Sequence, residues 1–270
     1  TPNKGTRDIY PDEMRVRNYI FSTWRKTIES YGYAEYGAPL LEPLDVYTAK
    51  SGQELASEQT YTFTDRGGRT VAIRPEMTPT ISRMIAARRQ EMGYPARLYS
   101  IANFMRYERP QRGREREFWQ LNIDMFGDDS IRSESEVITL ADQIVKDFGA
   151  TEDMYTIRIN NRKLVNVMMG QHLGLDVVQA QAMVKLFDRK AKISADDFNQ
   201  QAVEIFDGDN TDDRLNKLHN ILNANTMADL PAEITNSSAV TEVRELFTLL
   251  DKAKVTSAKF DITLMRGLDY

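Results

Sequence analysis

The chain has 270 residues, of which 41% are hydrophobic and 28% are charged, and it contains no cysteine, which excludes disulfides and thiolate chemistry. No apolar run approaches the ~20 residues that span a bilayer, and no apolar signal segment opens the chain, so we expect a soluble, cytoplasmic protein. The formal charge of −5 argues against a nucleic-acid-binding surface that is basic throughout, but it permits a local basic patch.

The N-terminal part of the chain predicts a helix, short strands and a second helix. An apolar stripe at helical spacing runs from Pro11, which suits a first helical turn, to Tyr31, and Gly32 ends it. A turn signal, Asp65-Arg-Gly-Gly68, separates two runs of strand-forming residues and predicts a hairpin. We therefore expect a helix, an extended segment, a hairpin and a helix at residues 11–31, 33–43, 61–73 and 78–89.

The next segment, residues 98–127, predicts two strands joined by a loop that is rich in arginine. Successive side chains of a strand point to opposite faces, so the second strand would have a core face and a polar face. The core face would hold Trp119, Leu121, Ile123 and Met125, and the polar face Phe118, Gln120, Asn122 and Asp124.

In the first strand of this hairpin, Arg106 and Glu108 share a face with Phe104. If that face adjoins Phe118 and Gln120, the hairpin offers a cation, a carboxylate, a flat ring and polar groups to one small molecule, and the loop arginines suit phosphate. The alternative is a solvated surface, because one face of an antiparallel sheet often meets water.

The remainder of the chain is mostly helical by its pattern. Residues 133–148 predict an amphipathic helix and 155–160 a strand, whereas 164–256 show helical periods and few strand signals. Residues 259–265 return to a strand pattern. This order predicts an α+β fold with an inserted helical domain. The corresponding domain boundaries are 1–163, 164–256 and 257–270.

Two kinds of site are disfavoured by the sequence. His172 and His219 lie in helical patterns without neighbouring ligand spacing, so we expect no metal site. No Gly-x4-Gly-Lys-Ser/Thr or Gly-x-Gly-x-x-Gly segment occurs, so ATP, if it binds, must bind without a P-loop.

Four segments resemble motifs of the class II aminoacyl-tRNA synthetases in their histidyl form. Residues 104–114 with 116–124 resemble motif 2, and residues 32–39 resemble motif 1 with its proline. Arg74-Pro-Glu-Met-Thr-Pro-Thr80 resembles the histidine-binding segment of this family, and Arg266-Gly-Leu-Asp-Tyr270 resembles the start of its histidine-specific signature. The four segments occur in the family's order along nearly the whole chain.

The resemblance implies a class II catalytic domain, an antiparallel sheet flanked by helices, at residues 1–163 and in a return strand at 257–270. The helical insertion at 164–256 would reach toward the tRNA acceptor stem. Motif 1 builds the dimer interface in this class, so the resemblance implies a homodimer. The implied reaction is histidine–tRNA ligation, in which ATP, with Mg²⁺ bound through its phosphates, activates L-histidine to histidyl-adenylate. The histidyl group then passes to the 3′ end of tRNA(His).

The resemblance also implies roles for individual residues. The catalytic arginines would be Arg106 and Arg266. ATP would contact Arg106, Glu108, Arg114 and Phe118; L-histidine would contact Glu76, Thr78, Gln120, Asp124, Arg266 and Tyr270; and the tRNA acceptor end would contact Gln111 and Arg116. Many family members carry Glu at the position of Asp124, so this shorter side chain would lie about a methylene farther from the imidazole ring.

The sequence departs from the family pattern at its end. It stops at Tyr270, before the second tyrosine of the signature and before motif 3, so we expect an N-terminal fragment of the catalytic domain that lacks one wall of the ATP pocket. The alternative is the regulatory subunit of ATP phosphoribosyltransferase, a non-catalytic paralogue that binds histidine. The residues retained from the synthetase motifs are Glu76, Arg106, Glu108, Gln120 and Arg266. Their joint retention favours the synthetase.

Overall fold

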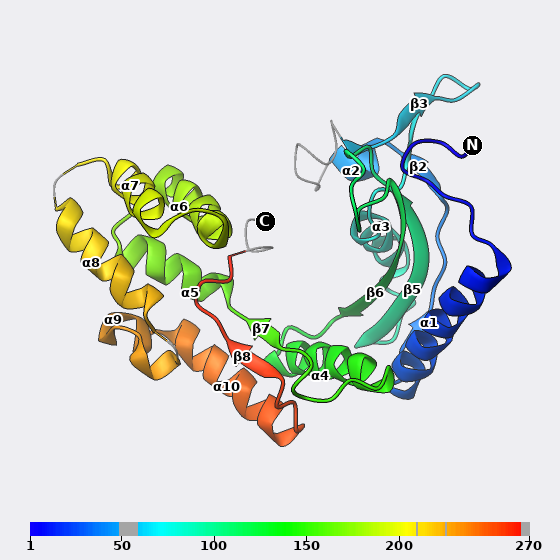
Figure 1. Cartoon of the computed structure of the whole chain (residues 1–270). Helices are drawn as coiled ribbons and strands as arrows, with labels where there is room; N and C mark the ends of the chain where they lie inside the picture. Colours follow the sequence, from blue (N-terminus) through cyan, green and yellow to red (C-terminus); the bar gives the residue numbers. More distant parts are fainter. Residues whose placement is uncertain (49–58, 209, 225, 266–270) are drawn as a thin grey trace. The chain divides into compact units, whose positions relative to one another are not determined.

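The computed structural model describes residues 1–48, 59–208, 210–224 and 226–265. It contains helices and sheets, which confirms the predicted α+β class, and the chain divides into two compact units, residues 1–129 and 130–270 (Figure 1). Within the described residues, the first unit has two sheets and the second unit has one, and each unit has its own helices.

The longest strands of the first unit form the predicted hairpin. β5 (Ala96–Met105) and β6 (Glu117–Phe126) are antiparallel along their whole length, and β1 (Ala34–Glu35) pairs with β5 in parallel. The register sets Phe104 opposite Phe118, so the two rings lie on the same face of the sheet.

Helix α1 (Pro11–Ser30) begins and ends as the sequence predicts. Pro11 occupies the first turn, and the Glu13 carboxylate accepts a hydrogen bond from the backbone N–H of Tyr10 at 3.2 Å, which satisfies a donor at the helix start. The helix ends where Gly32 adopts a φ of +81°, a conformation that favours glycine.

A second sheet in this unit is antiparallel, with the strand order β2-β4-β3. Its strands, and the two helices that accompany them, are β2 (Leu41–Pro43), β3 (Thr62–Thr64), β4 (Thr70–Ile73), α2 (Asp45–Thr48) and α3 (Thr78–Arg88). The predicted turn between β3 and β4 is confirmed, because Oδ1 of Asp65 accepts hydrogen bonds from the backbone N–H groups of Gly67 at 2.8 Å and Arg69 at 2.9 Å.

The burial of the β5–β6 hairpin differs from the predicted division into one core face and one polar face. Trp119 is 37% exposed, whereas Phe104 and Ala102, on the opposite face, are 0% and 7% exposed. Met77, at the start of α3, packs with Phe104 and Ala102, while Trp119 contacts Phe21 of α1. The face predicted to be polar is therefore the more deeply buried one, because Met77, Tyr36 and Ala38 pack against it.

The second unit consists of helices and one short parallel sheet. Its elements are α4 (Ile131–Asp147), β7 (Ile157–Ile159), α5 (Arg162–Asn166), the π-helix η2 (Val167–His172), α6 (Val177–Arg189), η3 (Lys190–Lys192), α7 (Ala195–Phe206), α8 (Thr211–Leu222), η4 (Met227–Asp229), α9 (Ala232–Thr235), α10 (Ser238–Lys252) and β8 (Ala258–Phe260). The predicted helical segment and a strand on each side of it are present, although β8 is shorter than the predicted strand.

β7 and β8 pair in parallel, so the two ends of the helical segment lie side by side. This pairing supports the predicted return strand. The compact units nevertheless divide at residue 129, before α4, and the domain boundaries at 163 and 256 stay a prediction.

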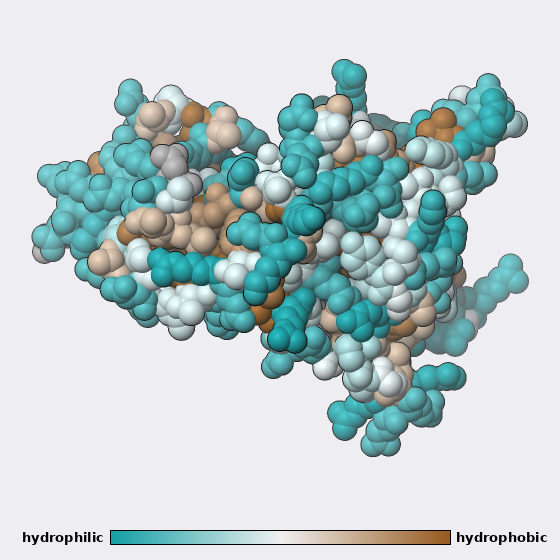
Figure 2. Space-filling model, turned by 90° about the horizontal axis from the view of Figure 1, so that it is seen from below, coloured by the Kyte–Doolittle hydropathy of each residue, from teal (hydrophilic) through white to brown (hydrophobic). Residues whose placement is uncertain are grey.

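Apolar helix faces form the core of the second unit, as amphipathic helices require. Fully buried side chains come from η2, α6, α7 and α10, among them Met168, Leu186, Phe206 and Val240. On the face of the molecule that Figure 2 shows, hydrophilic residues cover most of the surface and hydrophobic residues gather in a few places.

A buried carboxylate in α4 joins three parts of the second unit. Asp142 is 3% exposed and accepts hydrogen bonds from Nζ of Lys146 at 2.8 Å, from the Tyr155 hydroxyl at 2.7 Å and from Oγ of Ser257. Burial raises the pKa of Asp142, but the hydrogen bonds from these three groups outweigh it and hold the pKa below its usual value. The carboxylate therefore stabilises this unit in its charged form.

Candidate active site

The β5–β6 hairpin places Arg106 beside an aromatic pair. The Arg106 guanidinium lies 5.3 Å from the centre of the Phe118 ring, and that ring stacks on Phe104 with a centroid distance of 5.9 Å. Nε of Arg106 donates a hydrogen bond to the carbonyl oxygen of Pro75 at 3.0 Å, which fixes one edge of the guanidinium. A cation held in this way next to a flat ring suits a phosphate attached to a planar base.

The loop between the two strands gathers three predicted site residues at one cavity of about 440 Å³, which Glu108, Gln111 and Arg114 help to line. The Glu108 carboxylate forms an ion pair with Nε of Arg114 at 2.5 Å, and Gln111 exchanges backbone hydrogen bonds with Arg114 at 3.1 and 2.9 Å. Glu108 and Arg114 were both predicted to contact ATP. In this structure their charges neutralise each other, so a ligand that contacts both side chains would have to break their ion pair or bind while it stays intact.

Arg116 is fixed at the base of the same loop. Its Nε donates to the Glu108 carbonyl oxygen at 3.1 Å, its guanidinium lies 4.1 Å from the centre of the Tyr107 ring, and its backbone N–H donates to the carbonyl of Gly5 at 2.8 Å. Gln111, the other residue predicted to meet tRNA, is exposed. The two therefore differ, since Gln111 is open to solvent whereas Arg116 orders the loop.

Gln120 and Asp124 lie on the same face of β6 as Phe118, as the alternation predicts. The Tyr36 hydroxyl donates a hydrogen bond to Oδ2 of Asp124 at 3.3 Å. Burial raises the pKa of Asp124, and the hydrogen bond from Tyr36 offsets only part of that effect. Sequence reasoning missed Tyr36, which is held beside the sheet by a backbone hydrogen bond to Tyr99 at 2.9 Å.

The segment before α3 is anchored by Arg74, which is 6% exposed. Its guanidinium donates to the carbonyl oxygen of Asn103 at 2.8 Å, to Oδ1 of Asn103 at 3.1 Å and to the carbonyl oxygen of Ala38 at 2.9 Å. Burial lowers the pKa of Arg74. Glu76, which is half-buried, and Thr78, which is exposed, follow Arg74 by two and four positions in the chain.

Arg266 and Tyr270 lie outside the described residues, and the ligand contacts of all the predicted site residues stay predictions. Within the described ranges, no three His, Asp or Glu side chains are grouped so that they could hold a metal ion. In the same ranges, no helix is both long enough and apolar enough to cross a membrane.

Comparisons with known proteins agree with the predicted fold. A family model described as histidyl-tRNA synthetase matches residues 5–270. The histidine–tRNA ligase of Leptospira biflexa is 40% identical over 270 residues, which cover 99% of this chain and 61% of that protein. The chain therefore spans about three fifths of the length of this relative.

Two solved structures show the same fold over 100% of the chain. Histidyl-tRNA synthetase from Nostoc sp. PCC 7120 matches with a TM-score of 0.82 at 21% identity, over 62% of its length. An ATP phosphoribosyltransferase regulatory subunit/histidyl-tRNA synthetase from Bacillus halodurans matches with a TM-score of 0.83 at 23% identity, over 70% of its length. Because the family model spans almost the whole sequence, the chain belongs to the histidyl-tRNA synthetase family.

Proposed function

We propose that this protein is a histidine–tRNA ligase, which activates L-histidine with ATP and transfers it to the 3′ end of tRNA(His). Family membership supports the reaction class. The observation that carries the proposal is the position of Arg106 over the Phe118 ring. Gln120 and Asp124 lie on the same face of β6 as Phe118. This arrangement joins a phosphate-binding group to polar groups for an amino acid.

In the first step, a carboxylate oxygen of histidine attacks the α-phosphorus of ATP, and the bond to the pyrophosphate oxygen breaks. Arg106 would hold the α-phosphate and stabilise the charge that develops on it, while Phe118 would stack on adenine. Mg²⁺, bound through the ATP phosphates, would neutralise further charge. Glu108 and Arg114 would meet adenine and the outer phosphates after their ion pair opens.

The amino acid would lie along the polar groups of the same face. Glu76, Gln120 and Thr78 would hold the α-ammonium, whose charge must be paired once it leaves water. Asp124, which accepts a hydrogen bond from Tyr36, would contact the imidazole ring of the substrate. The raised pKa of Asp124 follows from the burial of its carboxyl group.

In the second step, the terminal ribose hydroxyl of the tRNA attacks the activated carbonyl of histidyl-adenylate and AMP leaves. Gln111 and Arg116 would contact the acceptor end, the first directly and the second by ordering the loop. Arg266 would act opposite Arg106 on the α-phosphate, and Tyr270 would shape the histidine pocket. The helical segment at 164–256 would face the acceptor stem.

The protein is also proposed to be a cytoplasmic homodimer. Tyr10, Val16 and Tyr19, at and within α1, are 69%, 60% and 57% exposed. Such a group of large exposed apolar side chains suits an interface with a second copy. Sedimentation at micromolar concentration should give a dimer, and a monomer alone would contradict this part of the proposal.

The function is tested by charging tRNA(His) with labelled histidine, using the protein at its native length. The expected result is charging that requires both ATP and tRNA(His), with a tRNA for another amino acid as the control. Histidine binding without charging would contradict the proposal. That outcome would favour the alternative, a histidine-binding regulatory subunit.

A further inference from the structure

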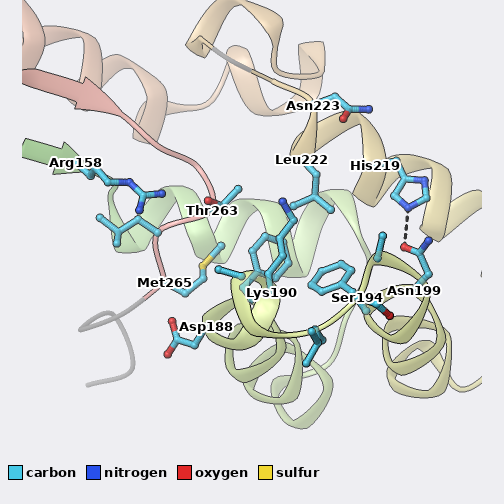
Figure 3. Close-up of a pocket in the computed structure, with 16 residues that line it drawn as sticks. Arg158, Asp188, Lys190, Ser194, Asn199, His219, Leu222, Asn223, Thr263 and Met265 are labelled. Atoms are coloured by element: carbon cyan, nitrogen blue, oxygen red, sulfur yellow. Dashed lines mark hydrogen bonds between the residues drawn. The ribbon is translucent and has the colours of Figure 1, made fainter. Parts of the chain in front are cut away.

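The second unit contains a cavity of about 700 Å³, and the proposed reaction assigns no role to the described residues that line it (Figure 3). It lies between α6, α7, α8 and the residues that follow β8. Its apolar lining includes Phe187, Phe198 and Met265, which are each at most 4% exposed and belong to the core of the unit. These side chains give the cavity a firm apolar floor, and its size is typical of small-molecule sites.

A hydrogen-bonded pair of side chains lines one side of this cavity. Nε2 of His219 in α8 lies 2.9 Å from Oδ1 of Asn199 in α7, as the dashed line in Figure 3 marks. An amide oxygen can only accept, so Nε2 carries the proton of this bond. The pair then offers the Asn199 amide N–H as a donor and Nδ1 of His219 as an acceptor, and within the described ranges neither atom has another hydrogen bond.

The charges around the cavity select an anion of low charge. Lys190 lines it, is exposed, and forms no ion pair with any described residue. Arg158, the other cation of the lining, is already paired with Asp261. Asp188 also lines the cavity and would repel a second negative group. One free lysine and one aspartate therefore suit a single anionic group and disfavour a polyphosphate.

We propose that this cavity binds a small planar heterocycle that carries a single anionic group, the chemical class to which nucleoside monophosphates belong. The ring would lie on the apolar floor, and its polar edge would meet the donor and acceptor of the Asn199–His219 pair. The anionic group, a phosphate or a carboxylate, would pair with Lys190. None of the described residues that line the cavity is assigned to the proposed ligase reaction, so the existence of this site does not depend on that activity.

The test uses the fact that the chain contains only two histidines, His172 and His219. In the NMR spectrum of histidine-labelled protein, AMP should shift the His219 imidazole resonance in a saturable way and leave His172 unchanged. A His219→Gln variant assigns the two resonances. Adenosine and inorganic phosphate, each lacking one half of the ligand, should bind at least about tenfold more weakly than AMP, a difference of about 1.4 kcal/mol.

Two lysines of η3 provide a matched pair of variants. Lys190→Ala should weaken AMP binding about tenfold. Lys192 belongs to the same helical turn but does not line the cavity, so Lys192→Ala should leave the affinity for AMP within about twofold of wild type. Arg106→Ala should leave the His219 shift in place. An absent His219 shift with both AMP and indole-3-carboxylate at millimolar concentration, equal effects of the two lysine variants, or loss of the shift in Arg106→Ala alone would each overturn the proposal. Indole-3-carboxylate in place of AMP distinguishes a carboxylate from a phosphate ligand, and either result supports the site.

Discussion

Replacing Arg106 separates its role in folding from its proposed role at the α-phosphate. Among the described residues, its side chain makes one hydrogen bond, to the Pro75 carbonyl at 3.0 Å, and one cation–π contact, with Phe118 at 5.3 Å. The hydrogen bond contributes about 1–2 kcal/mol and the ring contact about 0.5–1 kcal/mol at a partly exposed site. Arg106→Ala should therefore lower the free energy of unfolding by about 2 kcal/mol and leave a folded protein.

The same change should lower activity far more than stability. Loss of one charge-stabilising contact at a reacting phosphate lowers the rate about 10²–10³-fold, or about 2.7–4 kcal/mol. Arg106→Lys keeps the charge but loses the planar guanidinium and the Nε–H donor to Pro75. Its activity should therefore lie between those of Arg106→Ala and the wild type.

The assay is histidine-dependent ATP–pyrophosphate exchange at native length, with urea unfolding of each variant in parallel. Arg112→Ala, an exposed arginine of the same loop, is the control and should retain activity within about threefold. Exchange within twofold of wild type in Arg106→Ala would refute the reasoning. So would a loss of exchange that merely tracks unfolding.

Three further changes follow from particular contacts. Tyr36→Phe removes the hydrogen bond to Asp124 and should raise KM for histidine about fivefold, with kcat little changed; an unaltered KM would remove Tyr36 from the site. Asp142→Asn should destabilise the protein by about 2–4 kcal/mol at pH 7 in urea unfolding, because it weakens a buried network. The pKa of Asp142 is lowered, so its contribution is present above the ordinary carboxyl value of 3.8 and is lost as pH falls through the lowered pKa; a difference that does not shrink in acid would contradict this. Gly127→Ala should lower the free energy of unfolding by about 1–3 kcal/mol, because φ is +84° and a Cβ there would lie 2.5 Å from Cδ1 of Tyr94; unfolding at an unchanged urea concentration would contradict both the backbone strain and the clash.

Elements with strong local signals could be predicted from the sequence. The Asp65 turn was predictable because its hydrogen bonds join residues at most four positions apart. Helix α1 was predictable for a similar reason, because Pro11 and Gly32 act at the two ends of the same helix.

Features that depend on packing between distant segments could not be predicted in the same way. Alternation identified the two faces of β6 but not the more buried one, which depends on Met77 and its neighbours. The Tyr36–Asp124 hydrogen bond joins residues that are 88 positions apart. The ion pair between Glu108 and Arg114 depends on the conformation of the loop, so the charge pattern alone did not reveal it.

The most direct test of the proposed function is ATP–pyrophosphate exchange with and without histidine, on this 270-residue chain and on the protein at its native length. The proposal predicts exchange at native length that requires histidine and that Arg106→Ala lowers about 10²–10³-fold. Exchange by the 270-residue chain as well would show that its own residues suffice to form the adenylate. A protein that binds histidine yet gives no exchange at native length would contradict the proposal.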